Sequence, residues 1–382
     1  NHYYFDLNRD WVWQTQVETQ QRIKVYQKWM PQIHVDFHEQ GINSPYYFAP
    51  AAEPYHELIT KWQREFQYTI GRNHARHFDD KGWLYFTREV FDLFYPSYGD
   101  TYPTFNGAIG MTYEQGGSGA AGLAVQTEDQ DTLTLADRVL HHYTTALSTV
   151  EVASANAQQL IKEYRQYFNN AVKGTVGEYK SYVIRFKERD ELRLRAFCEL
   201  LDKNGIEYGR ATGTVKAMNY HTGKEESVTI GSEDIVISNA QPRASLLQVL
   251  MDPQPRLVDS ITYDITAWAL PYAYGINAFA SRQAVTVRPP TAVDSIVNKS
   301  ADMYGYAFRW QGMPSARVLA KLLQDNIRVR VAEKSFIIHG KTFDAGTVMI
   351  LKKGNEHLGT KLWRKLALAW KVTILAAPKC EV

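Results

Sequence analysis

Apolar and polar residues alternate along PQIHVDFHEQG, residues 31–41. Successive side chains of an extended strand point to opposite faces, so this alternation predicts one apolar and one polar face. The apolar face consists of Ile33, Val35 and Phe37, and the polar face consists of His34, Asp36 and His38. Two imidazoles and a carboxylate are common metal ligands, but the same pattern is typical of a strand with one solvated face. The alternation by itself leaves both interpretations open.

The hydrophobic pattern of residues 1–172 predicts short strands that alternate with longer helices. We expect strands at 5–8, 32–38 and 108–114, and helices at 15–30, 53–78 and 134–168. Segment 89–107 is rich in aromatic residues, proline and glycine, which indicates a loop over a surface, and the glycines of 115–122 indicate a turn. A strand, a helix and a second strand in this order are typical of a parallel sheet. The sequence therefore predicts an α/β region over 1–172.

After a linker at 169–179, two stretches of the chain have similar patterns. Residues 179–186, 192–211 and 221–238 correspond in order to residues 304–310, 316–333 and 338–354. Each stretch predicts a strand, a helix and further strands. We therefore expect an α+β region with an internal duplication, its repeats at 178–300 and 301–382. Two unrelated α+β units with ordinary patterning would give the same order of elements.

Composition narrows the functional classes. The 382-residue chain contains 45% hydrophobic and 22% charged residues, which is typical of a globular protein. Lys and Arg total 43 and Asp and Glu total 41, a net charge of +2 without a run of like charge, so we expect neither nucleic acid nor an anionic membrane as a partner. The longest apolar stretch, 265–280, is too short to cross a bilayer. Cys198 and Cys380 form no disulfide framework or thiolate metal site.

Four short motifs carry the candidate chemistry. They are LNRDW at 7–11, HVDFHEQG at 34–41, YPSYGDTYPTFNG at 95–107 and MTYEQGGSGAAGLA at 111–124. In order and approximate spacing they resemble the later catalytic half of zinc carboxypeptidases of the carboxypeptidase A type, and the resemblance covers about residues 1–150. Beyond residue 172 the chain is similar to the accessory region of large bacterial members of that family. The resemblance implies a partial carboxypeptidase-like mixed or parallel sheet with flanking helices.

The resemblance implies a metal ligand and a catalytic carboxylate. His38 would be the last zinc ligand, at the end of a sheet strand. Glu114 would be the carboxylate that activates zinc-bound water for attack on the scissile carbonyl and passes the proton to the leaving amine. The implied reaction is removal of C-terminal residues from peptides.

The resemblance also implies substrate-binding residues. Asn8 and Arg9 would hold the free C-terminal carboxylate of a peptide, a task that suits the planar, always charged fork of arginine. A tyrosine of the loop before Glu114 would cover the bound substrate. We favour Tyr95 over Tyr98 for this role.

The sequence departs from the family pattern in its metal ligands. Zinc in that family also needs a His-x-x-Glu pair, but no such pair precedes Asn8, and an arginine that would stabilise the oxyanion is likewise missing. One neutral imidazole does not hold zinc tightly without the partners that close a tetrahedral site. We therefore expect the two other ligands upstream of Asn1, and little or no peptidase activity from residues 1–382 alone. The resemblance implies a periplasmic or secreted location, which is usual for members of that family.

Other functions and plainer explanations fit the same residues. A second hypothesis is a non-catalytic relative that has lost the metal site and captures peptide or cell-wall carboxylates without turnover. A third possibility is that the duplicated second region is the main functional part and works as a protein-interaction or domain-packing scaffold. In the plainer explanation, Arg9 forms a surface ion pair with Asp10, and Glu114 is a solvent-exposed residue at the end of a strand.

Three further polar residues of interest lie away from the implied ligand. His34 and Asp36 lie roughly 13 and 7 Å behind His38 at about 3.3 Å per residue, so we expect them to be buried or to hydrogen-bond a strand or ligand. His74 lies three residues before His77 on a predicted helix, and we expect a surface pair there.

Overall fold

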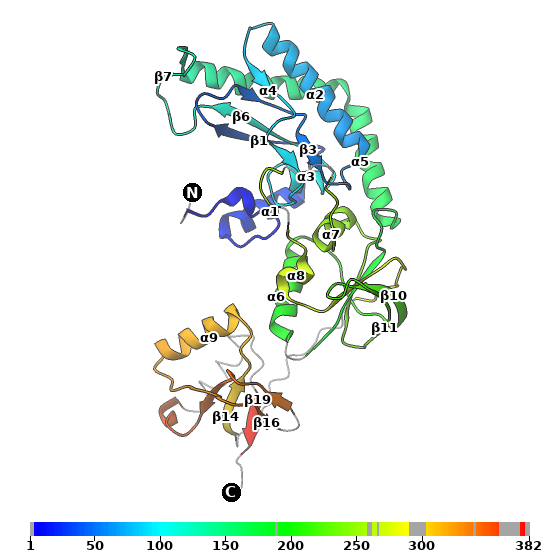
Figure 1. Cartoon of the computed structure of the whole chain (residues 1–382), viewed down its shortest axis with the longest axis vertical. Helices are drawn as coiled ribbons and strands as arrows, with labels where there is room; N and C mark the ends of the chain where they lie inside the picture. Colours follow the sequence, from blue (N-terminus) through cyan, green and yellow to red (C-terminus); the bar gives the residue numbers. More distant parts are fainter. Residues whose placement is uncertain are drawn as a thin grey trace. The chain divides into compact units, whose positions relative to one another are not determined.

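The computed structural model divides the chain into two compact units. The described residues are 4–187, 190–257, 262–265, 267–289, 303–338, 341–358 and 375–378. The first unit comprises Asn1–Arg185 and Cys198–Arg288, and the second comprises Phe186–Phe197 and Pro289–Val382. Both units contain helices and strands, which confirms the predicted α/β class (Figure 1).

A four-stranded mixed sheet in the first unit contains the strands predicted around His38 and Glu114. Its order is β1 (Ile33–Gln40), β6 (Ile109–Gly116), β2 (Tyr46–Tyr47) and β4 (Tyr85–Phe86). β1 and β6 are parallel, while β2 is antiparallel to β6 and parallel to β4. The strands expected at 32–38 and 108–114 are confirmed, and they form the expected parallel pair.

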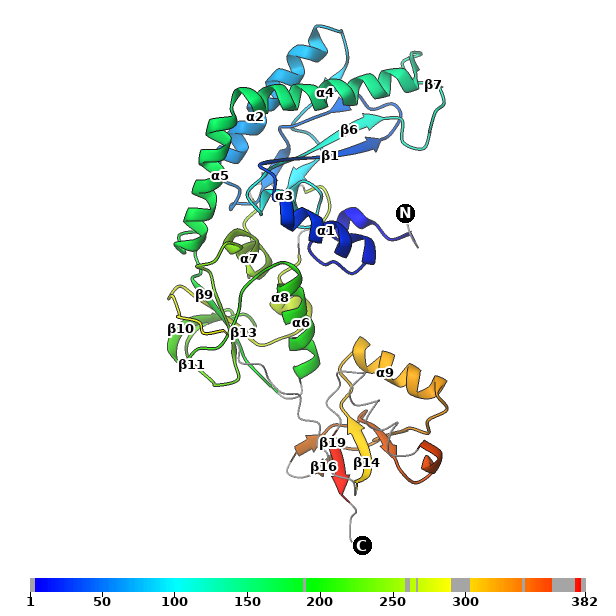
Figure 2. The same cartoon turned by 180° about the vertical axis from the view of Figure 1, so that it is seen from behind.

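The same region contains longer helices, two of which differ from the sequence prediction. The helices are α1 (Val17–Trp29), α2 (Lys61–Asp79), α4 (Leu135–Ala155) and α5 (Ala157–Val172). The helix expected over 53–78 begins only at Lys61, because Thr60 and Gln63 form a capping box at the start of α2. The helix expected over 134–168 is interrupted at Asn156, whose side chain donates a hydrogen bond to the carbonyl of Val152, and α5 continues from it (Figure 2).

The strand predicted at 5–8 is wrong. Residues Leu7–Arg9 form a short 3-10 helix, η2. Asp6 caps it, because its side-chain Oδ1 accepts the backbone N–H of Asn8 at 2.9 Å. A short acidic side chain that bonds its own backbone two residues on favours a turn over a strand, which explains the difference.

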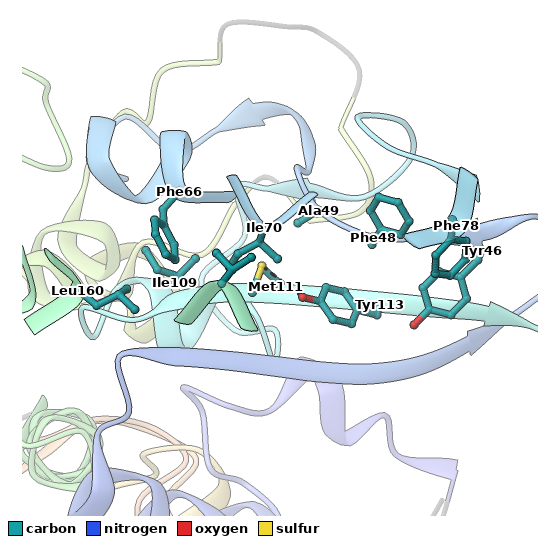
Figure 3. Close-up of a cluster of buried hydrophobic side chains, with 11 residues drawn as sticks. Tyr46, Phe48, Ala49, Phe66, Ile70, Phe78, Ile109, Met111, Tyr113 and Leu160 are labelled. Atoms are coloured by element: carbon teal, nitrogen blue, oxygen red, sulfur yellow. Dashed lines mark hydrogen bonds between the residues drawn. The ribbon is translucent and has the colours of Figure 1, made fainter. Parts of the chain in front are cut away.

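The main core lies between β6, β2 and the helix α2. Met111 and Tyr113 project from β6 toward Ile70 of α2 and Phe48, and all four side chains are buried (Figure 3). His74 also lies in this core: its two ring nitrogens lie 2.7 Å from the hydroxyl of Ser148 and 2.8 Å from that of Tyr113. The expectation of a surface His74–His77 pair is therefore wrong, because a histidine with both nitrogens bonded is stable inside a core.

Within segment 89–107, residues 92–107 are buried, which corrects the expectation of a surface loop. Its elements are β5 (Asp92–Leu93), which pairs in parallel with β3 (Ala52–Tyr55), and the single-turn helix α3 (Thr101–Thr104). The aromatic side chains of 92–107 are almost completely inaccessible to solvent; they are Phe94, Tyr95, Tyr98, Tyr102 and Phe105. The aromatic richness of this segment therefore reflects burial. A small hairpin, β7 (Val125–Gln126) and β8 (Thr132–Leu133), follows β6.

The rest of the first unit is built on a five-stranded sheet in the order β11-β10-β13-β9-β12. Its strands are β9 (Ser181–Ile184), β10 (Gly213–Asn219), β11 (Glu225–Ile230), β12 (Ile235–Ser238) and β13 (Ala278–Ser281). The helices of this part are α7 (Ala244–Met251) and α8 (Leu270–Tyr274), and a further helix, α6 (Glu191–Lys203), has residues 191–197 in the second unit and 198–203 in the first. Every residue of α7 is buried, as its apolar sequence ASLLQVLM predicts.

The second unit has a smaller sheet in the order β15-β18-β14-β19. Its elements are β14 (Met303–Phe308), α9 (Met313–Gln324), β15 (Arg330–Val331), β16 (Phe336–Ile338), β17 (Lys341–Phe343), β18 (Val348–Leu351), η4 (Glu356–Leu358) and β19 (Leu375–Pro378). β14 pairs antiparallel with β18 and β19, as β9 does with β12 and β13. The internal duplication itself stays a prediction.

Candidate functional site

The parallel register of β1 and β6 brings His38 and Glu114 together. The two residues are register partners near the carboxyl ends of their strands. Oε1 of Glu114 lies 4.0 Å from Nδ1 of His38. The carboxyl ends of parallel strands are where α/β proteins place their ligands, because the loops that follow leave a crevice there. The alternation along each strand therefore delivers an imidazole and a carboxyl group to one position.

Asp36 supports His38 from the same face of β1. Its Oδ2 lies 2.8 Å from Nε2 of His38, which assigns the proton to Nε2 and leaves Nδ1 facing Glu114. The hydrogen bond to Asp36 raises the pKa of His38 above its ordinary value, although burial acts in the opposite direction. Gly99 permits this arrangement, because a Cβ at that position would lie 1.8 Å from Oδ2 of Asp36.

Glu114 and Asp100 are buried carboxyl groups near His38 and Asp36. Burial raises the pKa of Glu114 to about 7 and that of Asp100 to about 6. Within the described part of the chain, Oε2 of Glu114 and Oδ1 of Asp100 have no hydrogen-bond partner, whereas Oδ2 of Asp100 accepts a bond from the hydroxyl of Thr112 at 2.8 Å. Glu114 therefore changes its protonation state near neutral pH, as an efficient general base does.

Replacing Asp36 with asparagine is expected to lower the pKa of His38. The amide carries no charge and is a weaker acceptor than the carboxylate that now holds the Nε2 proton. Titration of the His38 ring protons by NMR measures this directly. Glu39→Gln is the matched control, because Glu39 lies on the other face of β1 and is half exposed. An unchanged pKa of His38 in Asp36→Asn would contradict the assignment.

The 3-10 helix η2 brings Asn8 to the same end of the sheet. Oδ1 of Asn8 accepts the backbone N–H of Gly99 at 2.8 Å and the indole N–H of Trp11 at 3.1 Å. Its Nδ2 lies 3.4 Å from Nε2 of His38. Asn8 therefore ties η2 to the loop that carries Gly99 and lies directly beside the imidazole.

Arg9 lies next to Asn8, and its guanidinium contacts two carboxylates. Nε of Arg9 donates a hydrogen bond to Oδ2 of Asp264 at 2.7 Å, and Nη1 lies 3.2 Å from Oδ2 of Asp6. The guanidinium carbon lies 4.7 Å from the centre of the Tyr98 ring, a distance at which cation–π attraction is favourable. With 28% of its side chain exposed, Arg9 remains accessible to a ligand from solvent.

Tyr95 and Tyr98, the two candidates for the residue that covers a substrate, have different surroundings. The hydroxyl of Tyr95 accepts the indole N–H of Trp13 at 2.5 Å and donates to the backbone carbonyl of Arg9 at 3.3 Å. Both contacts would have to break before Tyr95 reached a substrate. Tyr98 instead presents its ring to the guanidinium of Arg9. The assignment of the covering role to Tyr95 stays a prediction.

Two of the residues around the site follow from the strand pattern and two do not. His34 is largely buried between the rings of Trp11 and Tyr26, in line with the expectation that it lies away from the ligand. Asp36 contacts His38 itself. The roles of Asp100 and Asp264 had no signal in the sequence; Asp264 in particular lies 255 positions from its partner Arg9.

The described residues do not complete a zinc site. Among them, no group of three or more His, Cys, Asp or Glu side chains has an arrangement that would hold a metal ion. His38 offers one imidazole nitrogen, and a structural or catalytic zinc needs at least three protein ligands. In the same described part of the chain, no helix combines the length and the hydrophobicity needed to cross a bilayer.

Comparisons with protein-family models, with curated proteins and with solved structures find no match to this chain. The resemblance to zinc carboxypeptidases therefore rests on the four motifs alone. The arrangement of the residues that those motifs contain is an independent observation, because it comes from the fold.

Proposed function

We propose that this chain carries the carboxylate-binding and proton-transfer part of a carboxypeptidase site. The observation that supports the proposal best is the cross-strand pair of His38 and the buried Glu114, with Arg9 held on the adjoining turn η2. Arg9 would bind the C-terminal carboxylate of a peptide. Asn8 would position the turn, because its Oδ1 accepts the backbone N–H of Gly99 and the indole N–H of Trp11. The partner of the site would then be a peptide with a free carboxyl end.

Glu114 is the proposed general base. With a pKa near 7, it takes a proton from the water that attacks the scissile carbonyl and returns that proton to the leaving amine. The peptide C–N bond breaks, a C–O bond forms, and no oxidant or reductant is required. The described residues do not complete a zinc site, so we assign no step to a metal. We expect weak zinc binding and little or no peptide hydrolysis by this chain alone, and calorimetry with zinc measures the former.

Non-catalytic capture of carboxylates is the second candidate. The observation in its favour is that the described residues include no metal-holding group while Arg9 and Tyr98 remain in contact. Binding without turnover needs only the arginine and its surroundings. Tight, stoichiometric zinc binding and hydrolysis of a peptide with a free carboxyl end would support the enzyme over the binding protein.

A peptide with a free carboxyl end is expected to bind at least about tenfold more tightly than the same peptide with a C-terminal amide. The reason is that a charge-assisted arginine–carboxylate bond contributes about 1.5–3 kcal/mol, and 1.4 kcal/mol corresponds to a factor of ten. Arg9→Gln should remove the preference. Fluorescence titration with an N-acetylated tripeptide ending in phenylalanine, as acid and as amide, provides the measurement.

The control for this experiment is Arg76→Gln. Arg76 is an exposed arginine of α2 that pairs with Glu151, so its loss removes one positive charge at a distance from the site. Arg9→Lys keeps the charge and removes the fork, and we expect it to recover only part of the preference. Equal affinities of the wild-type chain for acid and amide would contradict the proposed function.

A further inference from the structure

A short segment far along the chain, residues 262–265, lies against Arg9. Asp264 binds Nε of Arg9, and the ring centre of Tyr263 lies 5.9 Å from the guanidinium carbon. The Tyr98 ring is also in contact with the guanidinium, and the centres of the Tyr263 and Tyr98 rings are 6.2 Å apart. The segment thus forms part of the surroundings of the proposed carboxylate-binding group.

Buried contacts fix this segment in place. The backbone N–H of Tyr263 donates to Oδ2 of Asp92 at 2.7 Å, and Asp92 is only 5% exposed. The rings of Tyr263 and Phe91 pack with their centres 5.3 Å apart. Oδ1 of Asp92 accepts the backbone N–H of Phe94 at 3.1 Å, so the same carboxylate joins the segment to the buried loop that contains Tyr98. A carboxylate with both oxygens bonded is a firm anchor.

The two carboxylates at Arg9 contact different nitrogens of its guanidinium group. Asp264 takes the Nε hydrogen at 2.7 Å, while Asp6 lies 3.2 Å from Nη1 and is 55% exposed. An exposed ion pair of this kind contributes little to stability, so a ligand can replace Asp6 at little cost. Nη2 has no polar partner among the described residues. The end of the fork, Nη1 with Nη2, therefore remains the pair that matches a ligand carboxylate in two parallel hydrogen bonds.

We propose that Asp264 is a positioning residue of the site: by binding Nε, it orients the guanidinium of Arg9 so that Nη1 and Nη2 face an incoming peptide carboxylate. This inference rests on the proposed function. The long side chain of arginine loses rotamer entropy when it binds a ligand, and an intramolecular partner at Nε removes much of that cost before the ligand binds. Asp264 thus contributes to binding through Arg9, although it does not touch the peptide.

Asp264 also has an effect that weakens ligand binding, namely Coulomb repulsion of the ligand. A second carboxylate near Arg9 repels the ligand carboxylate, but Asp264 is 34% exposed, and solvent screens the repulsion. The asparagine variant separates the two effects. Its amide oxygen still accepts the Nε hydrogen of Arg9, whereas its negative charge is gone.

The test compares Asp264→Ala with Asp264→Asn in the titration of acid and amide tripeptides. We expect Asp264→Ala to weaken binding of the free acid about tenfold and to leave binding of the amide unchanged, because only the acid uses the fork. Asp264→Asn should bind the free acid within about threefold of the wild-type chain, or more tightly. Asp129→Ala, an exposed carboxylate in the turn between β7 and β8, is the control for loss of charge.

Each other result overturns the proposal. Unchanged or tighter binding of the acid by Asp264→Ala would show that Asp264 competes with the ligand or has no role. An equal loss in Asp264→Asn would show that the charge matters and the orientation does not, and an equal loss for acid and amide would show a structural defect. If the wild-type chain does not distinguish acid from amide, the proposed function fails. If it does, and Arg9→Gln abolishes the difference while Asp264→Ala keeps it, only this inference fails.

Discussion

Replacing Glu114 with glutamine is expected to raise the free energy of unfolding by up to about 3 kcal/mol at pH 8 and to leave it nearly unchanged at pH 4. Burial raises the pKa of this carboxyl group to about 7 from an ordinary 4.5, and one pKa unit corresponds to about 1.4 kcal/mol. The folded state therefore binds the proton more tightly than the unfolded state does. The resulting stability is present below pH 4.5 and is lost as the pH rises to 7.

Glutamine keeps the size of the protonated side chain and does not ionise, so the variant should lack this pH dependence. Denaturant unfolding at several pH values between 4 and 8 measures the difference between variant and wild type. Glu39→Gln on the adjacent part of β1 is the matched control, since Glu39 is half exposed and its register partner is Gln115. A constant difference between Glu114→Gln and wild type across this range would contradict the raised pKa.

Truncating Tyr113 to alanine is expected to lower the free energy of unfolding by about 3–5 kcal/mol. Tyr113 is fully buried, and its ring packs edge-on against Phe37 and His74. Its hydroxyl lies 2.8 Å from both Nε2 of His74 and the hydroxyl of Thr149. Truncation leaves a cavity behind β6 and deprives two buried polar groups of a partner.

Tyr113→Phe separates the cavity from the hydrogen bonds. We expect it to cost about 1–3 kcal/mol, because it removes only the hydroxyl between His74 and Thr149. Denaturant unfolding at pH 7 measures both variants. A loss in Tyr113→Ala no greater than that in Tyr113→Phe would show that the core closes around the missing ring. Tyr113 immediately precedes Glu114, so the alanine variant should also perturb the NMR titration of His38.

The candidate site was predictable from the sequence where strand periodicity governs it. Alternation along residues 33–40 and 109–116 fixes which side chains share a face, and the parallel pairing then places His38 opposite Glu114. The Asn8–Arg9 turn was predictable only in its position beside the site. The side chain of Asp6 accepts the backbone N–H of Asn8, which favours a turn over an extended strand. A bond between a side chain and the backbone does not alter the pattern of hydrophobic residues, so that pattern could not predict the turn.

The sequence by itself determined the α/β class, the two strands of the site and the chemistry of the side chains at their ends. Tertiary structure alone decided the burial of His74, the raised pKa of Glu114 and the contact of Asp264 with Arg9. The physical reason is that hydrophobic periodicity reports only which face of an element is apolar. Desolvation and ion pairing depend on what packs against that face, and here the decisive partners come from residues as far as 255 positions away in the chain.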